Sequence, residues 1–161
     1  MQSEPRHHHQ NYAKRRIQEV KHISNTIMDR TGTPSQYWLL CTLYAIMLSN
    51  HMAGETLGWR TPTEAAFNVK PDISPFLHHY WWEKVLFESQ ESFPKSREWS
   101  GRWVGIAPKQ GNILTYWILD GESKHVATRS NVKSFNSPTD SNLRSHLPVI
   151  DEQMQEDDIM Y

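Results

Sequence analysis

Two groups of basic side chains carry the clearest potential for chemistry in this chain of 161 residues. The first group is Lys14, Arg15, Arg16 and Lys21. The second group is Arg102, Lys109, Lys124, Arg129 and Lys133, which interleave along the chain with Trp99, Trp103 and Trp117. Lysine and arginine hold phosphate oxygens by charge, and aromatic rings offer bases a stacking platform. Both groups are therefore candidate nucleic-acid contacts.

Each group also has a purely structural interpretation. The first is equally compatible with the solvated face of a helix. On strands, Trp103 and Trp117 are better explained as core or cross-strand packing than as a platform for bases. Lys109 and Lys124 lie near expected turns, which makes them the better candidates for a contact within the second group.

Metal ligands and nucleophiles show no comparable pattern. His7, His8 and His9 lie in a polar stretch, and His51, His78 and His79 have no cysteine or histidine at metal spacing. We interpret the last three as surface or capping histidines. The single cysteine, Cys41, excludes an internal disulfide and a multi-cysteine zinc site, and is expected to be a small apolar filler. No phosphate-binding glycine loop, nucleophile elbow or zinc-protease motif is present. The sequence predicts neither a bound metal nor a cofactor.

Charge is unevenly distributed along the chain. The 17 basic and 18 acidic side chains give a net charge of −1, which excludes a nucleic-acid binder of strongly basic overall composition. Residues 151–161 hold five acids and no base, so the first 150 residues carry 17 basic against 13 acidic side chains, a net of +4. We interpret this acidic tail as a solvated, disordered end, with an electrostatic shield for a basic face as the alternative. No apolar run reaches the roughly 20 residues that span a bilayer.

Helical signals dominate the N-terminal half. An apolar stripe predicts a helix over residues 13–30 that stops at Gly32; its members are Ile17, Val20, Ile23, Ile27 and Met28. Residues 33–36 (Thr-Pro-Ser-Gln) predict a capping box that opens a helix over 37–48, which is apolar nearly all round. Because the chain offers few partners for that helix, we expect this half to self-associate or to fold loosely. Residues 61–64 predict a second capping box and a short helix near 65–67.

Strand signals follow from Tyr80 onward. Residues 80–87, 102–107, 113–119 and 124–132 are strand candidates, and Asp120-Gly121 is a typical hairpin turn. If 80–87 is one strand, Trp81 and Trp82 point to opposite faces, one into the core and one exposed. Short strands joined by tight turns indicate a small meander or barrel.

An ordered set of motifs resembles copia-type retrotransposon integrases. The motifs are residues 9–13 with 15–18 (related to Asn-x-x-Glu-Arg), 38–40 with Tyr44 and 50–51, 61–64, 70–74, 81–85, 101–105 (Gly-Arg-Trp-Val-Gly, where Gly-x-Phe-Val-Gly is usual) and 129–132. They cover about residues 9–135. Each is weak alone, but their order is specific.

The resemblance implies an α+β chain: N-terminal helices that are the remnant of an RNase H-like integrase core, followed by a small antiparallel SH3-like β-barrel. We expect disorder over 1–10, core helices over 11–55, a connector over 56–79, the barrel over 80–136 and a disordered acidic tail over 137–161. The start at Met1 inside the core fits a truncated gene or a miscalled start.

The family joins DNA with three carboxylates that hold two Mg²⁺ or Mn²⁺ ions. Lys14 occupies the position of the third carboxylate, and lysine offers no acceptor to a cation. The resemblance therefore implies a catalytically incompetent integrase fragment, without catalytic or metal-binding residues, in the nucleus or a cytoplasmic particle. Its expected partners are DNA, bound weakly and non-specifically, and the remainder of the integrase or another copy of itself. The alternative is a protein-interaction module built on the SH3-like barrel.

Overall fold

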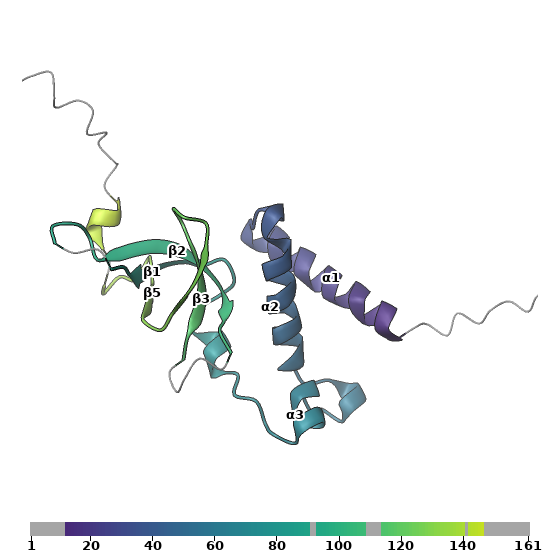
Figure 1. Cartoon of the computed structure of the whole chain (residues 1–161). Helices are drawn as coiled ribbons and strands as arrows, with labels where there is room; N and C mark the ends of the chain where they lie inside the picture. The colour runs from purple at the N-terminus through teal and green to yellow at the C-terminus, as the bar shows by residue number, and fades with distance from the viewer. Residues whose placement is uncertain (1–11, 91–92, 109–113, 141, 147–161) are drawn as a thin grey trace, which may run out of the picture.

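The computed structural model describes residues 12–90, 93–108, 114–140 and 142–146, and within them the chain is α+β (Figure 1). The α-helices are α1 (Tyr12–Thr31), α2 (Trp38–Asn50) and α3 (Pro62–Phe67). The strands are β1 (Lys84–Glu88), β2 (Glu98–Ile106), β3 (Tyr116–Asp120), β4 (Val126–Arg129) and β5 (Val132–Ser134). They form one antiparallel sheet in the order β4-β3-β2-β1-β5. The predicted class and the sequence of helices before strands are confirmed.

The sheet is open but strongly curled. The predicted fourth strand is in fact two strands, β4 and β5, which lie at opposite edges and are separated by only Ser130 and Asn131. In a flat sheet the edge strands β4 and β5 would lie four strand spacings apart, or about 19 Å. The link from Arg129 to Val132 has three residue steps, which cover only about 11 Å when fully extended. The sheet must therefore curl until its edges approach each other. A bulge between Trp103 and Gly105 in β2, where Gly105 has φ of 133°, adds to this curvature.

Helices α1 and α2 pack through small residues. Helix α1 matches the predicted span within a residue at each end and stops at Gly32, whose φ is 68°. At the crossing, the Cys41 thiol donates to the carbonyl oxygen of Ser24 at 3.6 Å, and both residues are buried. Burial raises the pKa of Cys41 to about 11. The predicted role of Cys41 as an apolar filler is confirmed.

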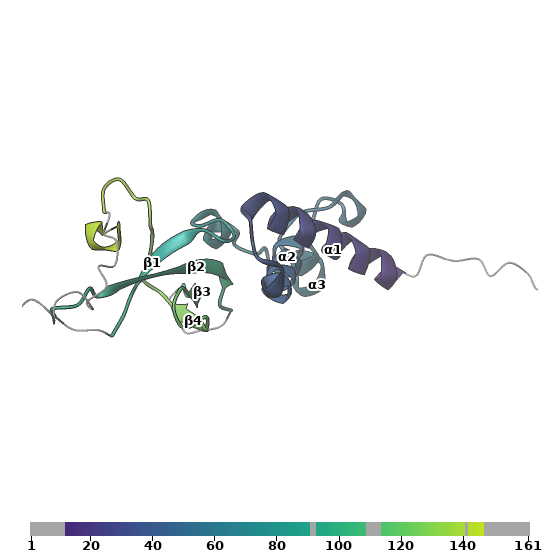
Figure 2. The same cartoon turned by 90° about the horizontal axis from the view of Figure 1, so that it is seen from above.

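One core joins α2 to the sheet. Tyr44 of α2 stacks on Trp81 at 5.1 Å between ring centroids and meets the edge of Trp103 at 5.6 Å. Figures 1 and 2 both place α2 beside the sheet. The expectation that the chain offers few partners for this helix is therefore wrong for the face that carries Tyr44. On its other face Trp38 is 59% and Leu39 54% exposed, so an apolar surface does remain.

The first predicted capping box does not form. A 3-10 turn (Ser35–Tyr37) opens α2, and Pro34 at its N-cap offers no side-chain acceptor. The Thr33 hydroxyl instead accepts from the indole N–H of Trp81 at 2.9 Å, because that buried donor needs a partner. The second box forms in part: the Thr61 hydroxyl accepts from the backbone N–H of Glu64 at 3.0 Å and caps α3.

The prediction for Trp81 and Trp82 is corrected. Both lie in a turn before β1 rather than on a strand, and Trp82 has φ of 66°. Their rings stack at 6.4 Å between centroids, and Trp82 also contacts Tyr37 at 5.1 Å. Both rings therefore turn toward the helices, and neither is the exposed aromatic that strand alternation predicted.

The Thr33 hydroxyl gives a first test of this helix–sheet contact. Thr33→Val keeps the shape but leaves the Trp81 indole N–H buried without an acceptor. We expect the free energy of unfolding to fall by about 1–3 kcal/mol, measured by urea denaturation. Thr26→Val is the matched control, because Thr26 bonds only to its own helix at the His22 carbonyl. Equal losses in the two variants would contradict the assigned role.

Candidate nucleic-acid interface

The cationic groove lies where the start of α2 meets the sheet and has a volume of about 350 Å³. Its three basic side chains are Lys84, Arg102 and Lys124, and its two aromatic rings are Tyr37 and Trp82. Sequence reasoning predicted Arg102 and Lys124 as contacts. It missed Lys84, whose place depends on strand register, a long-range property without a local signal.

Two of these cations are direct neighbours on the adjacent strands β1 and β2. Lys84 of β1 is the register partner of Arg102 of β2. Like charges in directly opposed positions destabilise a sheet. Here aromatic rings offset the cost: the Lys84 ammonium lies 3.6 Å from the centroid of Phe135, and the Arg102 guanidinium lies 5.8 Å from that of Trp82. A ring does not neutralise a cation, so the pair still attracts an anion.

Trp82 also positions Arg102 directly. Its carbonyl oxygen accepts a hydrogen bond from the guanidinium at 3.1 Å. A guanidinium carries five N–H donors, so this bond leaves others for a ligand. The arginine is thus oriented by the same turn that supplies the aromatic ring.

The one carboxylate among the groove's lining residues is turned to its own loop. Asp120 accepts from the backbone N–H of Glu122 and from the Ser123 hydroxyl, each at 2.9 Å. Lys124 closes the same turn with φ of 58°, and its ammonium donates to the Gly121 carbonyl. With three cations against one internally bonded carboxylate, the groove favours anions.

The other predicted residues of the second group lie elsewhere. The Arg129 guanidinium is 5.5 Å from the centroid of Phe87 and donates to the Thr128 carbonyl. Lys133 forms ion pairs with Asp140 at 2.8 Å and Glu98 at 3.0 Å, and the hydrogen bonds that it donates there raise its pKa above the usual value. Lys109 lies outside the described residues.

The predicted packing of the strand tryptophans is confirmed. Trp103 is fully buried, and Trp99 and Trp117 are half-buried against the core. None of the three lines the groove, so the structure draws its aromatic surface from Tyr37 and Trp82 instead. Sequence reasoning missed these two because it assigned them to a buried helix and to a strand.

The first basic group forms a separate surface on α1. Lys14 is the third residue of the helix, and Lys21, seven residues on, lies about 20° from it around the axis. Arg15 is exposed, whereas Arg16 pairs with Glu19 at 2.7 Å. Figures 1 and 2 place the N-terminal end of α1 on the side away from the sheet, so the two basic groups do not merge.

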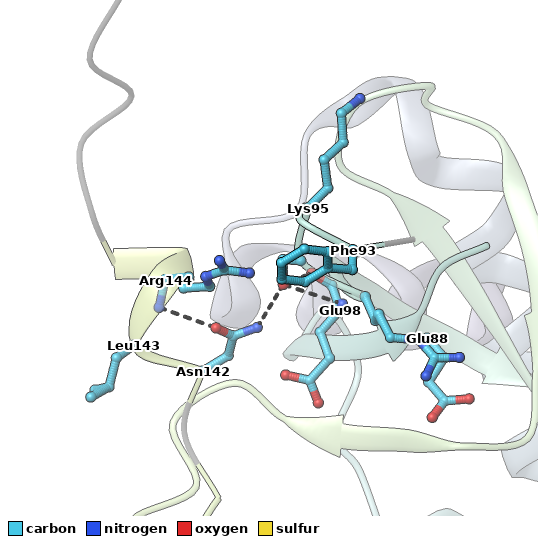
Figure 3. A pocket seen from close by; sticks show the side chains of 9 residues that line it. Glu88, Phe93, Lys95, Glu98, Asn142, Leu143 and Arg144 are labelled. Atoms are coloured by element: carbon cyan, nitrogen blue, oxygen red, sulfur yellow. Dashed lines mark hydrogen bonds between the residues drawn. The ribbon is translucent and has the colours of Figure 1, made fainter. Parts of the chain in front are cut away.

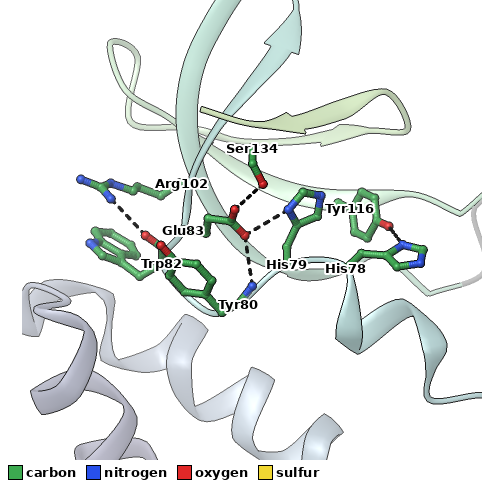
Figure 4. Close-up of polar contacts among 8 residues, drawn as sticks. All are labelled: His78, His79, Tyr80, Trp82, Glu83, Arg102, Tyr116 and Ser134. Atoms are coloured by element: carbon green, nitrogen blue, oxygen red, sulfur yellow. Dashed lines mark hydrogen bonds and ion pairs between the residues drawn. The ribbon is translucent and has the colours of Figure 1, made fainter. Parts of the chain in front are cut away.

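A buried carboxylate holds the turn behind the groove (Figure 4). Glu83 is 8% exposed and accepts three hydrogen bonds: from the Ser134 hydroxyl at 2.5 Å, from Nδ1 of His79 at 3.1 Å and from the backbone N–H of Tyr80 at 3.2 Å. It lies directly between Trp82 and Lys84 in the chain. The cluster therefore fixes the turn that carries Trp82 and leads into Lys84 of β1.

The predictions for the histidines are correct in part. His79 belongs to this buried cluster, so its interpretation as a surface or capping residue is wrong; the carboxylate 3.1 Å away explains its burial. Nδ1 of His78 lies 2.8 Å from the hydroxyl of Tyr116. Nδ1 of His51 lies 2.7 Å from the Met47 carbonyl and caps the end of α2, as predicted. His7, His8 and His9 lie outside the described residues.

Glu83→Gln tests whether the cluster supports the turn. The amide keeps the shape but replaces one acceptor oxygen by a donor, and it loses the charge that strengthens all three bonds. We expect a loss of about 1–3 kcal/mol in the free energy of unfolding, read from urea denaturation. Glu88→Gln, at an exposed position of β1, is the control and should change little. A result in which both variants match the parent protein would show that the cluster does not anchor the turn.

No three His, Cys, Asp or Glu side chains gather as a metal site within the part of the chain that the structure describes. None of the helices described there has the length and apolar character needed to cross a membrane. No family model, no curated protein and no solved structure matches the chain.

Proposed function

We propose that this chain is a nucleic-acid-binding fragment of a copia-type retrotransposon integrase, which binds DNA weakly and without sequence specificity. The observation that carries the proposal is the cationic groove, where Lys84, Arg102 and Lys124 meet beside Trp82. Cations held on rings and main-chain carbonyls can contact phosphates without reading base edges. The exposed cations Lys14, Arg15 and Lys21 of α1 add a second surface of the same kind.

The arrangement of elements supports the family assignment. The motifs occur in the order in which the resemblance requires them, and helices precede a five-stranded, strongly curled antiparallel sheet. We propose that this sheet is an SH3-like barrel and that α1 and α2 descend from the end of an RNase H-like core. In this proposal the chain works in DNA integration, in the nucleus or a cytoplasmic particle, beside the remainder of the integrase or another copy of itself.

The proposal does not include catalysis by this chain. The family position for the third carboxylate falls on Lys14, which is exposed in the first turn of α1. A lysine ammonium has three donors and no acceptor, and its charge repels a divalent cation. The chain's own residues would therefore hold DNA without processing it.

A salt titration tests the proposed binding. The full chain is mixed with a labelled 20-base-pair duplex, and anisotropy is recorded from 50 to 200 mM salt. Three phosphate contacts predict a slope of about −2.7 in log K against log salt, or roughly a 40-fold loss of affinity over that range. No binding at 50 mM salt, or affinity that salt leaves unchanged, would overturn the proposal.

A protein-interaction module is the second candidate function. An apolar groove of about 510 Å³ lies between α1 and α2, and its lining includes Ile17, Trp38 and Ile46, which are 56%, 59% and 41% exposed. Exposed apolar patches often mark protein contacts. Self-association that strengthens with salt, together with no DNA binding, would favour this candidate over the first.

A further inference from the structure

A second concavity, here called the end pocket, lies at the other end of the same strands (Figure 3). Its volume is about 600 Å³, and Phe93, Lys95, Arg97, Asn142 and Arg144 are among its lining residues. None of these residues was predicted as a contact from the sequence, and none belongs to the cationic groove. This size lies within the usual range of small-ligand sites, about 300–1,000 Å³.

Polar contacts hold the two walls of the end pocket together. The Asn142 amide donates to the Ser96 hydroxyl at 3.1 Å, across 46 residues of chain, and its oxygen accepts from the backbone N–H of Arg144 at 3.1 Å. The Ser96 hydroxyl also contacts both backbone groups of Glu98 at 3.3 Å. These bonds keep Arg144 beside β2, so the pocket is built by specific contacts.

The ring of Phe93 is the unusual element of this pocket. It is 92% exposed, whereas Phe87 of β1 is 3% exposed in the core. Burial of such a ring is worth about 1.5–3 kcal/mol, so an exposed one forgoes that gain. Phe93 and Arg144 both line the pocket, and both are labelled in Figure 3. A flat apolar face and an arginine in one pocket can together hold an unpaired base and its phosphate.

Charge in the end pocket favours an anion. Lys95, Arg97 and Arg144 line it with two carboxylates, Glu88 and Glu98. The Glu98 carboxylate is paired with Lys133 at 3.0 Å, so Glu88 is the other lining carboxylate, against Arg97 and Arg144. An acidic peptide would satisfy the cations but gives the exposed ring no base to stack on.

We propose that the end pocket binds one unpaired nucleotide of single-stranded nucleic acid, with its base stacked on Phe93 and its phosphate held by Arg97 and Arg144. The inference rests on the proposed function in that both concern nucleic acid. A duplex keeps its bases stacked on each other, so only a single strand can present a base face to this ring. Glu88 and Glu98 lie four residues along β1 and β2 from Lys84 and Arg102, about 13 Å. The groove and the end pocket thus lie at opposite ends of the same pair of strands.

Phe93→Ala tests the inference with two probes, a labelled ten-nucleotide thymidine strand and a 20-base-pair duplex. We expect affinity for the single strand to fall about tenfold, because one stacking contact is lost. Duplex affinity should stay within twofold. Phe93→Trp should retain single-strand binding. Phe67→Ala removes a ring that is 74% exposed on α3 and serves as the matched control without effect. Arg144→Gln should reduce the single-strand salt slope by about 0.7.

The outcomes separate this inference from the proposed function. Duplex binding by the parent protein, with single-strand affinity unchanged in Phe93→Ala, overturns the end pocket and leaves the groove standing. No binding of either probe by the parent protein overturns both. Displacement of the single strand by a short acidic phosphopeptide at equal concentration also overturns the inference, because it assigns the pocket to a protein ligand. Because Phe93 lies at the surface, unchanged thermal unfolding of the variants should accompany every result.

Discussion

Trp103→Ala is expected to lower the free energy of unfolding by about 3–5 kcal/mol, a large share of the 5–15 kcal/mol typical of a domain. Trp103 is fully buried at the junction of helix and sheet, where its ring contacts Tyr44, Tyr116 and His79 at centroid distances of 5.6, 6.1 and 6.2 Å. Loss of the ring opens a cavity between α2 and the sheet. Urea denaturation followed by far-ultraviolet circular dichroism measures the change.

Trp103→Phe separates the contribution of ring packing to the free energy of unfolding from the cost of the buried indole N–H. The indole nitrogen of Trp103 is buried and has no hydrogen-bond partner among the described residues. Phenylalanine removes this orphan donor, which relieves about 1–3 kcal/mol, and the smaller ring forfeits part of the packing energy. We expect a net change within about 1 kcal/mol. This agrees with the phenylalanine that is usual here in the family that the sequence resembles.

The comparison of the two variants decides the interpretation. Equal destabilisation by alanine and phenylalanine would show that the indole nitrogen makes a stabilising contact after all. Trp99→Ala is a useful control, since Trp99 lies on the same strand but is only half-buried. It should cost clearly less than Trp103→Ala.

Local signals predicted the elements well. The end of α1 at Gly32 and the cap of α3 at Thr61 both follow from residues that act on their own neighbours in sequence. The stripe of α1, and the aromatic and β-branched runs joined by turn residues in the second half, likewise predicted the class of the fold. Each of these features depends on contacts within about four residues.

Long-range contacts explain what the sequence did not predict. Thr33 has the spacing of a cap, but its hydroxyl serves an indole 48 residues away. Trp82 has a residue type favoured in strands, yet its positive φ belongs to a turn held by Glu83. The split of one apparent strand at Ser130 reflects pairing with two different neighbours, because β4 pairs with β3 and β5 pairs with β1.

The candidate site likewise combines residues that local signals predict with residues that only long-range contacts bring together. Charge alone indicated Arg102 and Lys124, and both line the groove. Register added Lys84, and the turn before β1 added Trp82. Lys133 looked equivalent in sequence, but it is bound to two carboxylates that come from β2 and from the segment after β5. Composition can supply candidate cations, and only tertiary contacts separate those that face a ligand from those that hold the fold.

The triple variant Lys84→Gln, Arg102→Gln, Lys124→Gln is expected to lose on the order of 30-fold in duplex affinity at 50 mM salt. Each glutamine keeps a polar side chain but removes one cation from the groove. If each cation neutralises one phosphate, the salt slope should become shallower by about 0.9 per substitution. Anisotropy with the labelled 20-base-pair duplex gives both quantities from one titration.

A matched triple variant, Arg30→Gln, Arg60→Gln, Lys70→Gln, separates the groove from overall charge. These cations are exposed on α1 and around α3 and do not line the groove. The two triples have the same net charge, so they alter long-range attraction alike. We expect the control to lose less than about threefold and to keep the parent slope, because it removes no phosphate contact. Equal losses and equal slopes would assign binding to diffuse charge, and the geometry of Lys84 opposite Arg102 would then have no part in it.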